Sequence, residues 1–529
     1  MSDKQRHIGV FPVTRAVGLF LGLLLFAFVL IIPRPTGMPA AAQRVAAVAL
    51  LMAAWWVTEA APIPVTSLLP IILFPLMGIT SAGDASAAFA HPLVFLFLGG
   101  FFLAMAMQQH NLHIRMALHI IRAVGVTPRR LILGFMCATA FLSMWISNTA
   151  TAMMMLPIAM AVCQSLEGLC FPDGETEPVV AEPKGTGQNG AGSGSIEGRR
   201  FGALMMLGIA YSASIGGIGT LIGTPPNVVF AAAVEKMYGQ VVDFASWMML
   251  GVPLVVIFIP IAWLYLTRVV FPLRNRRTPQ AAEAISRQLR ELGRPSRGEK
   301  LVLTVFILAA LSWIFRAQKD VFGVHIPGLD MIVPGIHDAT IAVAAALILF
   351  IAPVDWRRGE FGLNWRWARK IPWGTLLLFG GGLSLAAAFQ SSGLAPWIGE
   401  GVPGLSRMPP ILVLLVVIAG TAMLTEFTSN TATAAMLMPT LGAMAVGMGQ
   451  HPYFLMLAAC VAASLAFMLP VATPPNAVVY GSGKVRIAQM VKAGMWMNLL
   501  GIVLWTVLMY TLAMRLFGVV IGQVPVWAR

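Results

Sequence analysis

Two short polar motifs occur twice in this otherwise apolar chain, and both consist of residues that can bind ions without carrying charge. The first is SNT, at Ser147–Thr149 and again at Ser429–Thr431. The second is TPPN, at Thr224–Asn227 and again at Thr473–Asn476. Hydroxyl and carboxamide groups provide neutral oxygens that suit a hard cation and N–H or O–H donors that suit an anion. The chemistry that these residues favour is ion binding.

The two copies keep a strict register. The offset is 430 − 148 = 282 at the Asn of SNT and 439 − 157 = 282 at the next proline. At the Asn of TPPN it is 476 − 227 = 249, so the first copy carries 282 − 249 = 33 more residues between its motifs. A Gly- and Pro-punctuated polar motif repeated in both halves of a hydrophobic chain is the best sequence indication of a transporter's binding site. We therefore expect one site made by both halves.

Both motifs are expected to interrupt helices. SNT side chains favour local hydrogen bonds over a continued helix. The prolines of TPPN remove backbone donors and push the preceding residue out of the α region. Irregular backbone at membrane depth is tolerated only where it is buried in protein or lines a cavity. The broken helices then leave free carbonyl and amide groups for ligands.

The segments around the motifs are almost free of charge. No Lys, Arg, His, Asp or Glu occurs in 131–164, 201–234 or 452–483, and 408–450 contains only Glu426. A bound anion would need helix N-termini, hydroxyl donors and co-bound cations. The sequence favours both ligands at once, each raising the affinity for the other. Ordinary helix kinks satisfied by neighbouring helices are the alternative, but they do not explain two motif pairs in register.

The composition is that of a polytopic membrane protein. Hydrophobic residues make up 58% of the 529 positions, charged residues 11%, and the mean hydropathy is +0.81. Apolar runs and the motif regions predict roughly eleven spans of about 30 Å of hydrocarbon. The fold class that we predict is all-α. The first apolar run resembles a cleavable signal, but with so many later spans we expect a retained helix.

The basic residues predict an orientation. The formal charge of +14 is concentrated in short loops between spans, as the positive-inside rule produces, which argues against nucleic-acid binding. Placing these loops in the cytoplasm puts the N-terminus inside and makes the two SNT segments enter the membrane from opposite faces. An inverted repeat with both SNT turns near the midplane follows.

The predicted organisation has four parts. A tail and first span occupy 1–40, and a cytoplasmic interfacial linker occupies 273–300. The first repeat is 41–272, with a hairpin at about 130–165, a flexible loop containing IEGR at about 171–200, and a TPPN helix at 201–235. The second repeat is 301–529, with a hairpin at about 406–449 and a TPPN helix at 452–483.

With these motifs the chain resembles the divalent-anion:sodium symporter family, the carriers of dicarboxylates, citrate and sulfate. The resemblance covers nearly the whole chain, including WWVTEAAPIPVTSLLP at Trp55–Pro70, GTPPNVV at Gly223–Val229 and ATPPNAVVYGSG at Ala472–Gly483. It implies a homodimer in which a transport domain moves like an elevator against a scaffold. The expected location is a bacterial inner membrane, with lipid, sodium ions and a small anion as partners and no cofactor.

The resemblance also implies site residues. Substrate carboxylates would contact Ser147, Asn148, Thr149, Thr224, Pro225, Ser429, Asn430, Thr431, Thr473 and Pro474. One sodium ion would be held by Ser143, Ser147, Asn148 and Gly223. The other would be held by Thr425, Thr428, Asn430 and Ala472.

The expected function is sodium-coupled symport of a divalent anion, most simply a C4-dicarboxylate such as succinate. A sodium-independent exchanger and a sulfate carrier remain open. Both SNT motifs end in Thr, where sulfate-preferring relatives tend to vary, which favours a di- or tricarboxylate. A membrane enzyme is disfavoured because no catalytic motif occurs, and an anion channel because the motifs converge on a point instead of forming a continuous lining.

A few further residues invite a functional interpretation. Glu59 and Glu426 could act as relays, although capping a broken helix or bonding a backbone amide explains them more simply. His110, His113 and His119 are expected to be surface histidines and not metal ligands. The four cysteines have no metal-ligand spacing and are expected to be buried packing residues.

Overall fold

The protein is described by a computed structural model over residues 13–167, 196–273, 279–321, 324–401 and 407–528. The predicted tail before residue 13, most of the predicted loop at 171–200, and Cys170 lie outside the described residues. Within them, Cys163 and Cys460 are buried, as predicted, whereas Cys137 is only half-buried.

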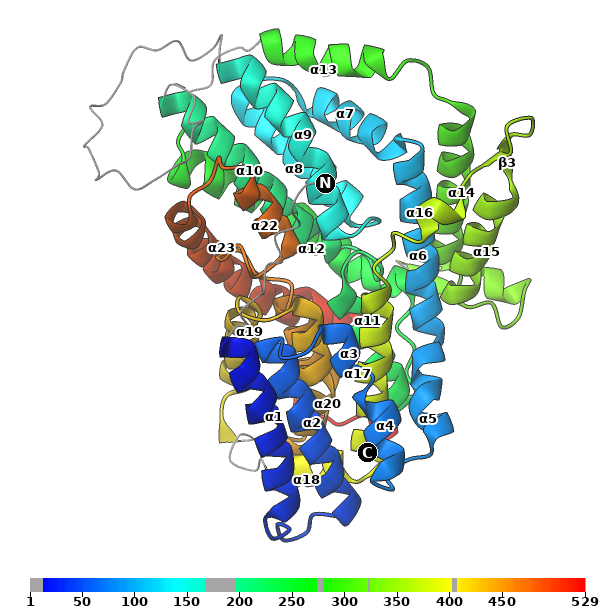
Figure 1. Ribbon diagram of the computed structural model, residues 1–529, viewed down its shortest axis with the longest axis vertical. Coiled ribbons are helices and arrows are strands. Elements are labelled where there is room, and N and C mark those ends of the chain that lie inside the picture. The colour runs from blue at the N-terminus through cyan, green and yellow to red at the C-terminus, as the bar shows by residue number, and fades with distance from the viewer. Residues whose placement is uncertain (1–12, 168–195, 274–278, 322–323, 402–406, 529) are drawn as a thin grey trace, which may run out of the picture.

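Helices make up most of the described chain (Figure 1). In chain order they are α1 (Val13–Ile31), α2 (Ala40–Thr58), α3 (Ile63–Thr66), α4 (Leu69–Leu76), α5 (Ala82–Ala87), α6 (Pro92–Gln109), α7 (Leu112–Val124), α8 (Pro128–Ser143), α9 (Asn148–Glu167), α10 (Ile196–Gly217), α11 (Pro225–Tyr238), α12 (Phe244–Tyr265), α13 (Pro279–Glu291), α14 (Arg297–Ile314), α15 (Asp338–Ile351), α16 (Trp365–Ala368), α17 (Trp373–Ser391), α18 (Leu394–Glu400), α19 (Pro410–Thr425), α20 (Asn430–Gly447), α21 (Tyr453–Ala462), α22 (Pro474–Gly481), α23 (Ile487–Leu508) and α24 (Met514–Leu516).

The sequence repeat extends to the helices themselves. The starts of α7 and α18, of α8 and α19, and of α9 and α20 are each 282 residues apart (394 − 112, 410 − 128, 430 − 148). The starts of α11 and α22 are 474 − 225 = 249 apart, and those of α12 and α23 are 487 − 244 = 243 apart. Even the π-helical ends of α12 and α23, η2 (Leu266–Val270) and η5 (Met509–Ala513), keep the offset of 509 − 266 = 243. The two halves are therefore built alike.

Each SNT motif lies at the turn of a helical hairpin. α8 and α9 are joined by the turn 144–147, and α19 and α20 by the turn 426–429. The α8–α9 hairpin lies in the upper half of Figure 1 and the α19–α20 hairpin in the lower half. The helix breaks expected at both TPPN motifs are confirmed, because the non-helical residues 218–224 separate α10 from α11 and 463–473 separate α21 from α22.

Two fully buried helices position these breaks. Every residue of Phe201–Gly217 in α10 and of α21 is buried, as expected for helices that are apolar on all sides. α10 packs against α8, α9 and α22, while α21 packs against α11, α19 and α20. The irregular segment 218–224 that follows α10 is buried throughout, whereas 463–473 after α21 is buried or half-buried except at the exposed Val471.

The outer surface is that of an integral membrane protein. Among the described residues, five helical stretches are long and apolar enough to cross a membrane. They are Ala40–Thr58, Ala82–Gln109, Phe244–Val270, Trp373–Ser391 and Ile487–Leu516. Several shorter apolar helices accompany them, including α19 and α21. Large apolar side chains such as Phe20, Leu24 and Val256 are more than half exposed, which suits contact with lipid.

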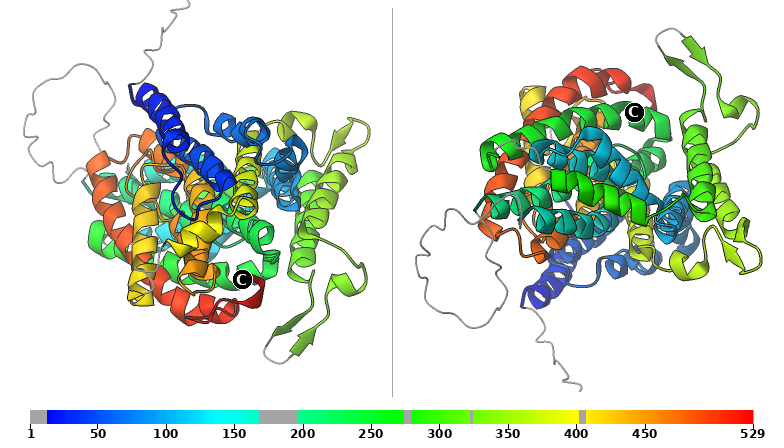
Figure 2. Two further views of the ribbon diagram at one scale, coloured as in Figure 1. Left: turned by 90° about the horizontal axis from the view of Figure 1, so that it is seen from below. Right: turned by 90° about the horizontal axis from the view of Figure 1, so that it is seen from above.

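The all-α prediction needs one correction. Two antiparallel ribbons, β1 (Lys319–Val321) with β2 (Val324–Ile326) and β3 (Pro353–Asp355) with β4 (Glu360–Phe361), occur in connections. The β1–β2 ribbon projects from one edge of the molecule (Figure 2). These strands are two or three residues long, too short to give a hydrophobic periodicity that sequence analysis could detect.

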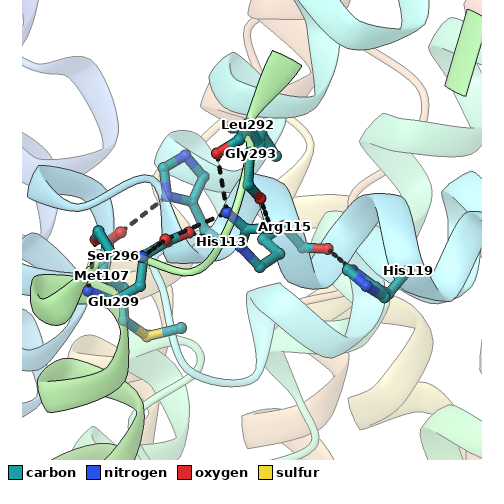
Figure 3. Close-up of polar contacts among 8 residues, drawn as sticks. All are labelled: Met107, His113, Arg115, His119, Leu292, Gly293, Ser296 and Glu299. Atoms are coloured by element: carbon teal, nitrogen blue, oxygen red, sulfur yellow. Dashed lines mark hydrogen bonds and ion pairs between the residues drawn. The ribbon is translucent and has the colours of Figure 1, made fainter. Parts of the chain in front are cut away.

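A single arginine joins α7 and α13, the helix within the predicted linker 273–300, to α14 (Figure 3). Arg115 of α7 binds the Glu299 carboxylate at 2.7 Å and donates to the carbonyls of Leu292 and Gly293 just after α13. Glu299 also closes a capping box with Ser296 at the start of α14. Seen from above, α13 lies across α7 and α9, which it contacts (Figure 2).

The prediction of surface histidines is right for His119 and wrong for His113. His119 is exposed, whereas His113 is buried, with its Nδ1 3.1 Å from the Met107 carbonyl. Burial lowers the pKa of His113. The error arose because His113 lies on the apolar face of α7, which packs on α8.

Candidate ion-binding site

The first half-site brings together a hydroxyl, a carboxamide and two backbone carbonyls. The Ser143 hydroxyl lies 2.6 Å from Asn148 Oδ1 and 2.6 Å from the Ala213 carbonyl. A hydroxyl has one proton, so it can bond only one of these two acceptors at a time. The same amide atom of Asn148 lies 3.1 Å from the Ala213 carbonyl and 3.3 Å from the Gly223 carbonyl. A cation among these oxygens would relieve the crowding, as would an amide turned to present its nitrogen.

The second half-site repeats this pattern. The Thr425 hydroxyl lies 2.7 Å from Asn430 Oδ1 and 3.0 Å from the Ala463 carbonyl. Here, too, one proton is shared between two acceptor oxygens. Thr425 and Ser143 are 282 residues apart, as are Asn430 and Asn148. Both half-sites thus place a hydroxyl, an amide oxygen and a carbonyl together, which are the neutral ligands that a sodium ion uses in unwound membrane helices.

The last residue of each TPPN motif braces the irregular segment before it. Asn227 Nδ2 donates to the carbonyls of Gly217 at 3.1 Å and Thr220 at 2.7 Å. Asn476 Nδ2 donates to the equivalent carbonyls of Ala466 at 3.3 Å and Leu469 at 3.0 Å. These bonds satisfy carbonyls that the ended helices leave free.

Helices that carry the motifs of one half pack against those of the other half. α22, the TPPN helix of the second half, packs against α9, the SNT helix of the first, and α11 packs against α20 in the reciprocal way. Cys460 of α21 lies 3.3 Å from the carbonyl of Pro226 in α11, and the rings of Tyr211 and Phe467 are 5.1 Å apart across the same boundary. Four helices, α9, α11, α20 and α22, begin at the two motif pairs. The N-terminus of a helix favours negative charge.

Charge is nearly absent from this region of the described chain. The one carboxylate in the motif segments, that of Glu426, is bonded to the backbone amides of Phe467, Met468 and Leu469. Its predicted role in bonding backbone amides is therefore confirmed. Among the described residues no cluster of His, Cys, Asp and Glu could hold a metal ion. The arrangement can hold a hard cation through neutral oxygens and an anion through helix N-termini.

The predicted site residues fall into two groups. Ser143 and Asn148 are brought together with the Gly223 carbonyl, and Thr425 is brought together with Asn430. Other predicted ligands make separate contacts: the Thr428 hydroxyl bonds the Leu424 carbonyl and the Thr433 hydroxyl, the Ser147 hydroxyl accepts from the Ala150 amide, and the Ala472 amide donates to the Leu469 carbonyl.

The predicted substrate contacts differ in exposure. Ser147, Asn148, Thr149, Pro225, Ser429 and Asn430 are half-buried, Thr224, Thr431 and Thr473 are buried, and Pro474 is exposed. Sequence reasoning missed the bracing role of Asn227 and Asn476, although their place at the end of TPPN in both halves was a usable signal. It also missed Gly217, at which a Cβ would lie 2.5 Å from Asn148 Oδ1. Nothing in the sequence indicates that contact.

Neutral oxygens at paired helix breaks, inside a polytopic helical protein made of two similar halves, define an ion-binding membrane transporter. The chain belongs to the family described as sodium:sulfate symporter transmembrane region, whose family model matches residues 13–519. The resemblance inferred from the motifs is thus confirmed.

Individual relatives span nearly the same length. The chain is 40% identical over 522 residues to the sodium-dependent dicarboxylate transporter SdcS of Staphylococcus aureus, covering 98% of this chain and 95% of the relative. It is 39% identical over 526 residues to the protein of that name from Staphylococcus saprophyticus, covering 99% and 96%.

Solved structures with a similar fold are also transporters by description. The YdaH transporter of Alcanivorax borkumensis aligns with a TM-score of 0.53 at 15% identity, covering 96% of this chain and 97% of that one. MtrF of Neisseria gonorrhoeae, described as illuminating a class of antimetabolite efflux pumps, aligns with a TM-score of 0.56 at 13% identity, covering 95% and 98%. The likeness concerns the fold alone.

Proposed function

We propose that this protein is a secondary active transporter that couples sodium influx to uptake of a C4-dicarboxylate such as succinate. The observation that carries the proposal is the shared pattern of the half-sites, in which a hydroxyl, the carboxamide of the SNT asparagine and a backbone carbonyl lie together at the same repeat positions. The names of the Staphylococcus relatives, which are about as long as this chain, support sodium as the cation and a dicarboxylate as the anion.

In this proposal each half-site holds one sodium ion. Ser143, Asn148 and the Gly223 carbonyl would hold the first, with Ser147 beside them. Thr425, Asn430 and the Ala472 carbonyl would hold the second, with Thr428 beside them. The carbonyls of Ala213 and Ala463 are further candidate ligands, because each lies within 3.0 Å of a site hydroxyl.

The dicarboxylate would lie between the two half-sites. Its carboxylates would contact the SNT residues Ser147, Asn148, Thr149, Ser429, Asn430 and Thr431, together with Thr224, Pro225, Thr473 and Pro474. The two sodium ions and four helix N-termini would balance its charge, since the motif segments supply no cationic side chain. Substrate and sodium would then bind cooperatively, and this mutual dependence couples their transport.

Two other activities are distinguished by specific features. The family's description names sulfate, and a sulfate ion could use the same helix N-termini. The Thr at the end of both SNT motifs and the dicarboxylate named for the relatives favour a carboxylate. A sodium-independent exchanger would not need the crowded oxygens of both half-sites.

The finer architecture belongs to the same proposal. The α8–α9 and α19–α20 hairpins would be re-entrant and of opposite orientation, which their positions in opposite halves of Figure 1 support. The protein would be a homodimer with an elevator motion, and it would have no cofactor and no enzymatic activity. It would lie in a bacterial inner membrane with its N-terminus in the cytoplasm. The charge distribution supports this orientation.

Uptake of labelled succinate into proteoliposomes, with and without an inward sodium gradient, tests the proposal. The wild type should accumulate succinate only with the gradient, and Asn148→Ala and Asn430→Ala should each lose accumulation. Uptake that ignores sodium but requires internal dicarboxylate would establish an exchanger. Sodium-driven uptake of sulfate that succinate does not inhibit would establish a sulfate carrier.

A further inference from the structure

The two half-sites differ in one buried charge. Glu426 stands directly after Thr425 and is 1% exposed. Its Oε1 accepts from the Phe467 amide at 2.7 Å and the Met468 amide at 3.0 Å, and its Oε2 accepts from the Leu469 amide at 3.1 Å. The amide of Asn498 in α23 adds a bond of 2.7 Å to Oε1. The carboxylate thus receives hydrogen bonds from three successive backbone amides and one side chain.

The first half has no such group. The position 426 − 282 = 144 is Met144, whose side chain offers no comparable acceptor. The amides equivalent to those of Phe467 and Met468 belong to Ile218 and Gly219. They donate to the carbonyls of Ile215 at 3.1 Å and Gly216 at 2.9 Å. In the first half these amides therefore form tight turns with the end of α10.

The local sequences explain this difference. The first break reads GGIGTLIGT over 216–224, and the second reads LAFMLPVAT over 465–473. At Gly216 a Cβ would lie 2.3 Å from the Ala140 carbonyl, and at Gly219 it would lie 2.9 Å from the Met144 side chain. Glycines therefore allow the first break to fold tightly against α8, whereas the bulkier second break needs outside partners for its amides.

We propose that Glu426 is a positioning residue for the second sodium ion. The inference rests on the proposed function. The carboxylate fixes the irregular segment 463–473, which supplies the Ala463 carbonyl, against the hairpin turn that supplies Thr425 and Asn430. Bonds from backbone N–H groups to a carboxylate are strong, so the segment is held firmly.

The test is the sodium dependence of succinate uptake by proteoliposomes, measured for the wild type and three variants. Glu426→Gln removes the charge and one acceptor at nearly constant volume, and we expect the sodium concentration for half-maximal uptake to rise roughly tenfold. Asn498→Ala removes one hydrogen bond to the same carboxylate and should raise the sodium concentration for half-maximal uptake about threefold. Met144→Leu, at the equivalent position of the first half, should leave this sodium concentration unchanged. Maximal uptake at saturating sodium should be largely retained in all three.

Each other outcome has a definite meaning. Wild-type sodium dependence in both Glu426→Gln and Asn498→Ala, or lower maximal uptake without a change in sodium dependence, overturns the positioning role. If Glu426→Gln fails to fold, the sodium dependence of uptake by Asn498→Ala alone decides whether Glu426 has the positioning role. A sodium-dependent rise in melting temperature in detergent, weakened in the same variants, provides a readout independent of transport. Sodium-independent uptake by the wild type overturns the proposed function itself, and the inference with it.

Discussion

The first and second half-sites share their ligand geometry but not the means of holding it. In both, a hydroxyl lies between an amide oxygen and a backbone carbonyl, and the Asn of TPPN braces the preceding segment. The irregular backbone is closed by glycine turns in the first half and by a carboxylate in the second. Groups that would contact ions follow the repeat closely, while the groups that support them have diverged.

The two halves also differ in exposure. Val471 at the second break is 77% exposed, whereas its equivalent, Ile222, is 6% exposed. Phe427 at the second hairpin turn is 70% exposed, whereas its equivalent, Trp145, is half-buried and stacks near Phe244. The first break is thus enclosed by protein, and the second is open on one side. Similar clusters of hydroxyl, amide and carbonyl groups therefore occur in an enclosed and in an open setting.

The largest expected effect comes from removing the shared hydroxyl in either half. Ser143→Ala and Thr425→Ala should each reduce sodium-driven succinate uptake roughly 100-fold, because each deletes a proposed ion ligand and leaves two acceptor oxygens facing each other. The exchanges Ser143→Thr and Thr425→Ser keep the hydroxyl and should retain much of the activity. Uptake rates at fixed protein density check this. If only one alanine variant is impaired, the half-sites are not equivalent in function.

The next largest effect is expected at Gly217, a glycine that only the first half requires. Gly217→Ala would place a Cβ 2.5 Å from Asn148 Oδ1, so the amide must move and uptake should fall at least about tenfold. The equivalent position, 217 + 249 = 466, already holds alanine, and Ala466→Gly should change uptake less than about twofold. Equal losses in both variants would show that this close approach is unimportant.

The helices α7 and α18 provide a third comparison. Arg115 of α7 and Trp397 of α18 are 397 − 115 = 282 apart, and each ties its helix to a distant connection. Arg115 binds Glu299 and two carbonyls, and Trp397 Nε1 donates to the Thr36 carbonyl at 3.3 Å. Arg115→Ala should lower maximal uptake several-fold and the melting temperature, because it leaves a buried carboxylate unpaired. Trp397→Phe loses one exposed bond and should have a smaller effect on both quantities.

The smallest effect is expected at the hydroxyl pair that only the second half contains. Thr428 bonds Thr433 at 2.6 Å, whereas the equivalent of Thr428 is Ile146. Thr428→Val should raise the sodium concentration for half-maximal uptake about two- to threefold through loss of one neutral hydrogen bond. A loss as large as that in Thr425→Ala would instead make Thr428 a direct sodium ligand.

Sequence alone predicted the parts of this protein that depend on local chemistry. Proline in TPPN and the polar run of SNT predict where helices end, and helices do end at both motif pairs. The contact of Gly217 with Asn148 and the bonds of Asn227 were not, because they join residues whose approach only tertiary packing decides. The burial of His113 was missed for a similar reason, since the partner of the apolar face of α7 is unknown before folding.

If both half-sites carry a sodium ion with each dicarboxylate, the two ions are transported in a fixed ratio to the substrate. Parallel uptake of labelled sodium and labelled succinate by wild-type proteoliposomes, with the membrane potential clamped, measures this ratio directly. We expect at least two sodium ions for each succinate, with steeper than linear dependence of uptake on sodium. A ratio of one, or succinate uptake without sodium movement, would contradict this expectation.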